Sequence, residues 1–161
     1  MPIRLGHLRL DVADLDRQSA FYTEALGLTV RERATDEESH YAFLTDCAPV
    51  PGGAGDGMHH RLVLRQARDG SAPDRGGPLD HVAWEVDDEA ELLAVVERLR
   101  GMGVETDLQE AQIAWQCYAE DPEGNKFEVY CDRRARPDGA PLWRGRQEDL
   151  PESRLRDAAE R

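Results

Sequence analysis

The chain has 161 residues, of which 40% are hydrophobic and 33% are charged, and its formal net charge is −13. This length suits one domain, or two small modules that share a core, and the composition is typical of a soluble globular protein. The negative charge argues against nucleic acid and anionic membranes as partners, and no apolar run reaches the roughly 18 residues of a membrane helix.

The N-terminus and the cysteines indicate the compartment. The first residues lead directly into a strand-like sequence, without the apolar region of a secretory signal. The three cysteines, Cys47, Cys117 and Cys131, are an odd count without the spacing of a metal site. We therefore expect reduced thiols and a cytoplasmic protein.

An alternating pattern predicts the first strand, over Leu5–Val12. One face carries Leu8, Leu10 and Val12, and the other carries His7, Arg9 and Asp11. We expect the apolar face to pack under a helix and the histidine face to line a polar cup. A helix over Leu15–Ala25 should follow, with Asp14 near its N-cap and Gly27 at its end. The next predicted strands are Thr29–Arg33, Ser39–Thr45 and Arg61–Gln66.

The second half of the chain repeats this pattern at an offset of 74 residues, which places His81 on His7 and Gly101 on Gly27. Its predicted helix is Glu89–Arg100, after a strand that begins near His81. Its remaining predicted strands are Val104–Asp107, Ala114–Glu120 and Lys126–Cys131, with a tight turn over Asp121–Asn125 between the last two. Two loops rich in Gly and Pro, Ala48–Gly57 and Ala67–Pro78, should be flexible.

These elements predict an α+β fold with two tandem βαβββ modules, over about residues 3–66 and 79–132. The modules would form a curved mixed sheet around a metal-binding cup. Residues 1–132 would make one domain, and residues 133–161 a partly irregular C-terminal extension with a short amphipathic helix through Leu150, Leu155 and Ala158. Whether the modules pair within one chain or exchange between subunits stays open.

Three side chains are candidates for a metal site. His7 and His81 occupy equivalent positions of the repeat, and alternation places Glu128 on the cup face of the last strand. Two histidines and one carboxylate on one face of a metal are the set typical of non-heme Fe(II) oxygenases. Considered without the two histidines, Glu128 could instead be a strand residue exposed to solvent.

The stretch Ile3–Asp132 resembles the vicinal oxygen chelate superfamily of glyoxalase I, fosfomycin and bleomycin resistance proteins, epimerases and type I extradiol dioxygenases. The motifs that carry the resemblance are Gly6-His7-Leu8, Phe21-Tyr22, Leu26-Gly27-Leu28, Asp80-His81-Val82-Ala83 and Asp121-Pro122-Glu123-Gly124-Asn125-Lys126-Phe127-Glu128. Glyoxalase I adds a carboxylate ligand on the last strand of its first module, where this chain has Val63. The resemblance therefore implies three protein ligands, as in the dioxygenases.

The resemblance also implies two catalytic residues. His60 precedes the strand of Val63, where the dioxygenases keep a catalytic histidine that exchanges a proton with the catechol. Tyr118 lies ten residues before Glu128, at the spacing of the active-site tyrosine, and would orient the ring. The alternatives are a polar loop end for His59 and His60 and an ordinary strand aromatic for Tyr118.

Four further residues are candidates for substrate binding. Tyr130 should face the cup, and Trp115 could form a pocket wall, although a strand or core aromatic is the alternative for each. Gln112, like Gln116, lies where the family places polar groups around the site. Arg144, or Arg146, could receive a substrate carboxylate, with an ordinary surface arginine as the alternative.

The sequence thus predicts an Fe(II)-dependent extradiol dioxygenase that inserts O2 into a small monocyclic catechol, with Mn(II) as a possible substitute metal. L-DOPA, the substrate of compact family members in natural-product pathways, is the first substrate hypothesis. A homo-oligomer, dimeric or larger, is expected. The alternatives are a metal-dependent lyase or isomerase of the glyoxalase or epimerase kind, and a drug-binding resistance protein without catalytic activity.

Overall fold

A computed structural model describes residues 5–46, 59–73, 77, 79–142, 145 and 147–161 of the protein. The chain divides into two compact units, Met1–Pro78 and Leu79–Arg161. Each unit contains one predicted βαβββ module, so the α+β fold of two tandem modules is confirmed. No described helix has the length and apolar character needed to cross a membrane.

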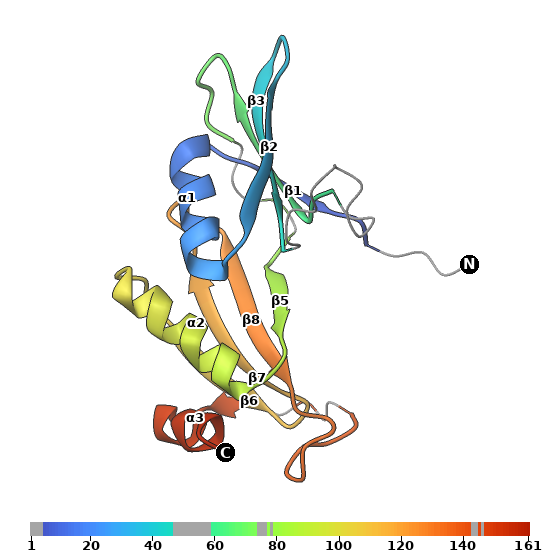
Figure 1. Ribbon diagram of the computed structural model, residues 1–161, viewed down its shortest axis with the longest axis vertical. Helices are drawn as coiled ribbons and strands as arrows, with labels where there is room; N and C mark the ends of the chain where they lie inside the picture. The colour runs from blue at the N-terminus through green and yellow to red at the C-terminus, as the bar shows by residue number, and fades with distance from the viewer. Residues whose placement is uncertain (1–4, 47–58, 74–76, 78, 143–144, 146) are drawn as a thin grey trace, which may run out of the picture. The chain divides into compact units, whose positions relative to one another are not determined.

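The first unit is a four-stranded sheet with one helix (Figure 1). Its elements are β1 (Leu8–Asp11), α1 (Leu15–Leu26), β2 (Thr29–Thr35), β3 (Ser39–Thr45) and β4 (Leu62–Ala67). The strand order is β1-β4-β3-β2, and only the β1–β4 pair is parallel. The helix between β1 and β2 packs against β3, β4 and β2, and Leu44, Leu62 and Leu64 of this sheet are fully buried. Of the apolar side chains predicted to lie under the helix, Val12 is buried, whereas Leu8 and Leu10 are only half-buried.

Both predicted ends of α1 are confirmed. The Asp14 carboxylate accepts a hydrogen bond from the Arg17 backbone N–H over 2.9 Å, which satisfies one of the free N–H groups of the first turn. Gly27 ends the helix in the left-handed region, with φ of 71°, where a residue without a Cβ has no steric penalty. The helix therefore starts and stops where the sequence places these two residues.

The second unit repeats the arrangement and adds two elements from the C-terminal extension (Figure 1). Its elements are β5 (Val82–Val86), α2 (Glu89–Gly101), β6 (Asp107–Ala111), β7 (Ala114–Glu120), β8 (Lys126–Asp132), β9 (Glu148–Asp149) and α3 (Glu152–Ala159). The strand order is β5-β8-β7-β6-β9, and only the β5–β8 pair is parallel. The α2 helix packs against β8, β7 and β5.

The end of α2 differs from the prediction. Gly101 belongs to the helix, and the left-handed residue is Gly103, with φ of 77°. The Val104 backbone N–H bonds back to the Leu99 carbonyl over 2.9 Å, so Val104 completes the helix end instead of starting a strand. For this reason β6 begins at Asp107, three residues later than predicted.

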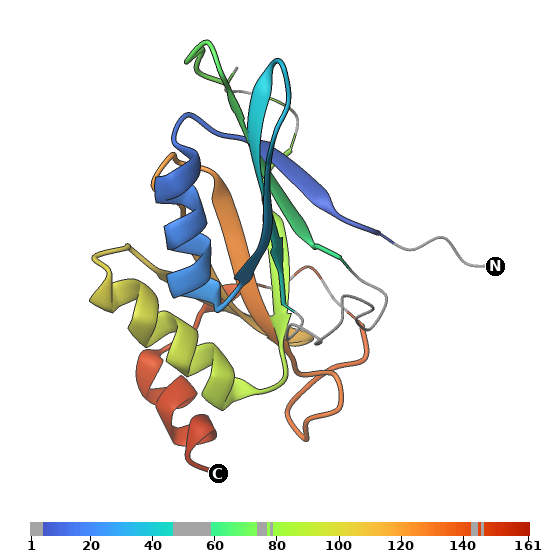
Figure 2. The ribbon, with the colours of Figure 1, turned by 45° about the horizontal axis from the view of Figure 1, so that its top comes forward.

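The C-terminal extension packs on the second unit. β9 pairs with β6, and the Leu150 N–H bonds to the Leu108 carbonyl over 3.0 Å. The predicted amphipathic helix is present as α3, with Leu155 fully buried beside α2 (Figure 2), although Leu150 precedes the helix. The β9 strand was not expected from the sequence, because a strand of two residues is too short to show an alternating pattern.

Candidate metal centre

Each module places its histidine at the equivalent position of its own sheet, directly before the first strand. In β1, the residue two positions after His7 is Arg9, which pairs with Val63 of β4. In β5, the residue two positions after His81 is Ala83, which pairs with Glu128 of β8. Val63 and Glu128 are therefore structural equivalents, as the family resemblance implies, and the two modules differ at this position by one possible metal ligand.

His81 and Glu128, two of the three predicted ligands, lie close together within the second unit. The His81 Nε2 lies 3.0 Å from the Glu128 Oε2, and the Glu128 side chain is buried, with 8% of its surface exposed. Two donors about 2.1 Å from one divalent metal, at right angles to each other, lie about 3 Å apart. The donor pair therefore fits a shared metal ion.

Asp80 holds the His81 ring in the orientation that such a site needs. The His81 Nδ1 donates a hydrogen bond to the Asp80 Oδ2 over 2.6 Å, which leaves Nε2 as the nitrogen that faces Glu128. This hydrogen bond, and next the charge of Lys126, hold the pKa of Asp80 below its usual value. At protein metal sites, a histidine ligand usually donates its other ring N–H to a carboxylate or a backbone carbonyl in this way.

Tyr118 lies beside this pair. Tyr118 is the register partner of Glu128, and its ring stands edge-on to the His81 ring with 5.6 Å between centroids. Burial, then the Glu128 charge and a hydrogen bond to Glu128, raise the pKa of Tyr118 to about 12. The structure therefore brings three of the predicted site residues together in the second unit.

His7 and His60 are neighbours in the first unit. Their ring centroids are 4.6 Å apart, and the Phe43 ring lies 5.0 Å from the His60 ring. Burial, followed by the charges of His7 and His59, holds the pKa of His60 below its usual value. The His60 Nε2 is buried without a hydrogen-bond partner among the residues that the structure describes. The predicted catalytic histidine thus lies next to the predicted ligand of its own module.

A cavity beside Glu128 has polar and apolar walls, and its apolar lining residues are Ile113, Ala114, Pro141 and Leu142. It has a volume of about 420 Å³, and its polar lining residues are Gln116, Glu128, Tyr130, Asp132 and Arg134. Tyr130 lines it as predicted from the alternation of β8 and donates a hydrogen bond from its hydroxyl to the Glu85 Oε2 over 3.1 Å. This bond holds the Glu85 carboxylate beside Tyr130, two residue pairs along the sheet from Glu128.

Two predicted substrate residues, Trp115 and Gln112, lie away from this cavity. Trp115 is buried on the opposite, helix-covered face of the sheet, because it alternates with Gln116 along β7. Gln112 lies in the turn between β6 and β7 and lines a different cavity from Glu128. Both are therefore corrections to the predicted substrate pocket. Arg144 lies outside the described residues.

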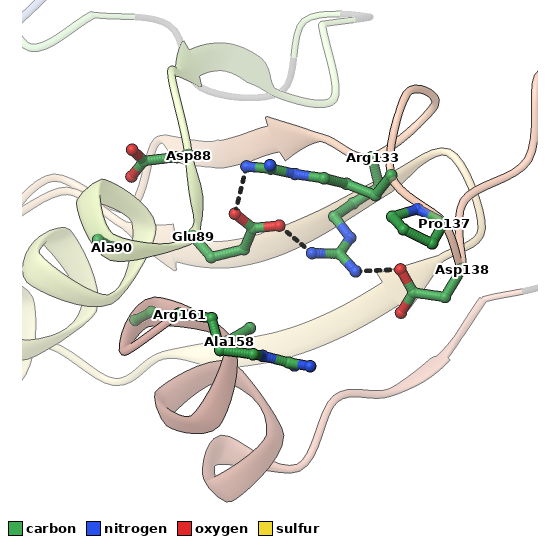
Figure 3. A pocket seen from close by; sticks show the side chains of 10 residues that line it. Asp88, Glu89, Ala90, Arg133, Pro137, Asp138, Ala158 and Arg161 are labelled. Atoms are coloured by element: carbon green, nitrogen blue, oxygen red, sulfur yellow. Dashed lines mark hydrogen bonds and ion pairs between the residues drawn. The ribbon is translucent and has the colours of Figure 1, made fainter.

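A second cavity of about 630 Å³ lies at the start of α2 (Figure 3). The buried Glu89 carboxylate accepts hydrogen bonds from Arg133 and Arg136, and Arg133 also pairs with Asp138. The Arg133 guanidinium stacks on the Trp115 ring at 3.9 Å from its centroid. Because these charges are paired with one another, we assign the network a structural role, which is to fasten the segment after β8 to α2.

Neither unit alone holds a complete metal site. Within the described part of each unit, no three His, Cys, Asp or Glu side chains are placed to hold a metal ion together. The predicted ligands are divided along the chain, with His7 in the first unit and His81 and Glu128 in the second. The cysteines add no ligand, because Cys117 and Cys131 are buried free thiols whose pKa values burial raises to about 12 and about 11, and Cys47 lies outside the described residues.

The fold and the histidine pattern agree with a comparison against protein families. Residues 4–129 match the Glyoxalase/Bleomycin resistance protein/Dioxygenase superfamily. The chain belongs to this superfamily. A search among curated proteins gave no match.

Solved structures of the superfamily share the fold. A glyoxylase/bleomycin resistance protein/dioxygenase domain from Frankia sp. EAN1pec is 26% identical over 83% of this chain and 100% of that chain, with a TM-score of 0.64. The trypanothione-dependent glyoxalase I of Leishmania major is 23% identical over 83% and 88% of the two chains, with a TM-score of 0.62. A Listeria monocytogenes fosfomycin resistance protein, solved with Mn(II), is 20% identical over 81% and 93%, with a TM-score of 0.59.

Two residues of the site were not expected from the sequence. Asp80 orients His81, and Asp132 lines the cavity beside Arg134. The alternation of β8 could have found Asp132, because it continues the face of Glu128 and Tyr130. Asp80 directly precedes the histidine, but no periodic pattern shows that its carboxylate turns back to the ring.

Proposed function

We propose that this member of the superfamily is an Fe(II)-dependent extradiol dioxygenase that cleaves a small monocyclic catechol with O2. His7, His81 and Glu128 would hold the metal, with Mn(II) as a possible substitute. The observation that carries the proposal is the apolar Val63 at the position equivalent to Glu128. A ligand set of two histidines and one carboxylate leaves adjacent positions for two catechol oxygens and for O2.

The surroundings of Val63 support a set of three ligands. Val63 is 4% exposed within the first unit, and its side chain has no atom that can coordinate a metal. Glu85 of β5 pairs with Tyr130, two residue pairs beyond the pair of Ala83 and Glu128, and accepts the hydrogen bond of the Tyr130 hydroxyl. At the position equivalent to Glu128, the first unit therefore has no donor for the fourth protein ligand of a glyoxalase-type set.

The chain's own residues would bind and orient the catechol and exchange its proton. When bound, Fe(II) would keep both catechol oxygens and O2 on one centre. His60, next to His7, has a buried ring nitrogen that can take a proton from a catechol hydroxyl and return it. The Tyr118 hydroxyl, beside His81 and Glu128, can donate a hydrogen bond to the catechol oxygen that has lost its proton.

Oxygen consumption tests the proposal. The protein should be reconstituted with Fe(II) without oxygen, and a monocyclic catechol and O2 should then be added. We expect one O2 consumed for each catechol and a yellow ring-opened product. Isomerisation of a thiol adduct with Ni(II), without O2 uptake, would show a glyoxalase-type enzyme instead, and binding without either reaction would show a resistance-type binding protein.

A further inference from the structure

We propose that Glu32 and His59 are positioning residues for His60, and that they hold its ring in the tautomer whose free nitrogen, Nε2, accepts the catechol proton. The inference rests on the proposed function and adds two residues to the site. It follows from a chain of polar contacts within the first unit.

A β-bulge turns Glu32 toward the histidines. At this point β2 has one extra residue opposite β3, so that Glu32 pairs with Phe43. A regular ladder would pair Glu32 with Ala42 instead, on the opposite face of the sheet. Phe43 also pairs with Val63, so Glu32 lies on the face that carries the position equivalent to Glu128.

Three side chains form the chain of polar contacts beside Phe43. The Glu32 Oε2 lies 3.1 Å from the His59 Nε2, and the His59 Nδ1 lies 2.9 Å from the His60 Nδ1. The Phe43 ring packs edge-on to both imidazoles, with centroid distances of 5.8 Å to His59 and 5.0 Å to His60. The chain thus links an exposed carboxylate to the histidine whose ring lies beside that of His7.

The carboxylate determines which ring nitrogens carry protons. An ionised carboxylate only accepts hydrogen bonds, so the His59 Nε2 that faces Glu32 carries a proton. The other nitrogen of a neutral imidazole is an acceptor, and the His59 Nδ1 therefore accepts a hydrogen bond from the His60 Nδ1. This leaves a lone pair on the His60 Nε2, which is the buried nitrogen without a partner among the residues that the structure describes.

The tautomer fixed in this way suits the proposed proton exchange. The His60 Nε2 would take a proton from a catechol hydroxyl and later return it, while Nδ1 keeps its own proton. The hydrogen bond from Nδ1 to His59 would keep the ring in one orientation and stabilise the imidazolium that forms in between. The aspartate of a serine protease triad acts on its histidine by the same physical means.

NMR of the metal-free full chain tests the tautomers without turnover. The five histidines are isotopically labelled at their ring nitrogens, and each signal is assigned by a histidine-to-alanine variant. At about pH 8, where histidines are mainly neutral, we expect the proton on Nδ1 in His60 and on Nε2 in His59. A proton on the His60 Nε2, in all or part of the molecules, would overturn the inference.

A variant of Glu32 connects the tautomer to catalysis. Glu32→Gln keeps the shape but can donate as well as accept, so we expect mixed tautomers in His60 and a kcat about tenfold lower, the effect of about one hydrogen bond. The KM for the catechol, the iron content and the melting temperature should stay the same, whereas a merely structural role would change the melting temperature. Unchanged tautomers or an unchanged kcat would contradict the inference.

The matched control is Glu37→Gln. Glu37 is exposed in the turn between β2 and β3, so the same chemical change there should leave the tautomers and kcat unaltered. Melting curves show whether Glu32→Gln is folded. If it is not, His59→Ala replaces it and should lower kcat by a similar factor, because it removes the hydrogen-bond acceptor of the His60 Nδ1.

The two measurements separate this inference from the proposed function. If the native chain cleaves catechols and Glu32→Gln does so at the same rate, the dioxygenase proposal stands and the positioning role is wrong. If the native chain consumes no O2 with any catechol, the proposed function is wrong, and the positioning role falls with it even where the tautomers are as expected.

Discussion

The two modules of this chain share a strand register and differ in chemistry. Each has a histidine directly before its first strand, continues into a helix with an aspartate N-cap, and pairs its first strand in parallel with its last. At the position where the second module has Glu128, the first has Val63, and where the second has Asp80 behind its histidine, the first has Gly6. The shared positions build the fold, whereas the positions that differ define the site.

The largest effect is expected when Glu128 is replaced by the residue that the first module has at the equivalent position. Glu128→Val removes the only carboxylate of the proposed ligand set, so we expect loss of nearly all bound metal and of O2 uptake. Iron content after anaerobic reconstitution and gel filtration measures this directly. The melting temperature of the variant should no longer rise with metal, whereas that of the native chain should. If the variant keeps its iron, Glu128 is not a ligand of the metal.

The next largest effect is expected at His60, whose ring lies beside that of His7. His60→Ala should keep the metal, because His60 is not in the ligand set, but should lower turnover by about 10² to 10⁴-fold through loss of the proton acceptor. Single-turnover kinetics with the iron-loaded variant measures the loss. Loss of the metal, or no change in turnover, would contradict the catalytic role of His60.

The reverse substitution gives Val63 the residue that the second module has at the equivalent position. Val63 is buried, so Val63→Glu places an unpaired carboxylate in the core and should destabilise the metal-free protein by about 3 kcal/mol. If the new carboxylate reaches the metal, added metal should recover much of this loss, while O2 uptake should fall because one open position is filled. Urea denaturation with and without metal measures both effects. Val63→Ile keeps the position apolar and is the control.

The smallest expected effect concerns the carboxylate behind His81. Asp80→Asn keeps the shape but weakens the bond that orients the ring, and metal affinity should fall by about 10 to 100-fold. Competition with a chelator of known affinity measures the change. The equivalent change in the first module, Gly6→Asn, should leave the affinity nearly unaltered. Equal losses in the two variants would show that Asp80 has no special role.

Much of the fold could be predicted because local patterns determine it. Alternation identified β3 and β7 with their observed ends, and the aspartate and glycine positions located the ends of α1. The start of β6 was missed because the Val104 N–H completes the end of α2, a backbone hydrogen bond that no side-chain pattern shows.

The site could be predicted only where it follows the strand register. Tyr118, Glu128 and Tyr130 share a face because they lie on neighbouring strands in fixed register, and His81 directly precedes β5, which pairs with β8. Trp115 was misplaced although alternation puts it on the face opposite Gln116, and Gln112 was misplaced because it sits in a turn, where the period of two ends. The environment of His60 depends on Phe43 from β3, a contact between residues far apart in sequence.

A crystal structure of the Fe(II)-loaded protein, grown without oxygen, tests the proposed ligand set most directly. We expect His7, His81 and Glu128 to be the only protein ligands, with the remaining positions held by water or an added catechol. A fourth protein ligand, or iron held by His59, His60 and Glu32 instead, would contradict the three-ligand site and the oxygen chemistry proposed for it.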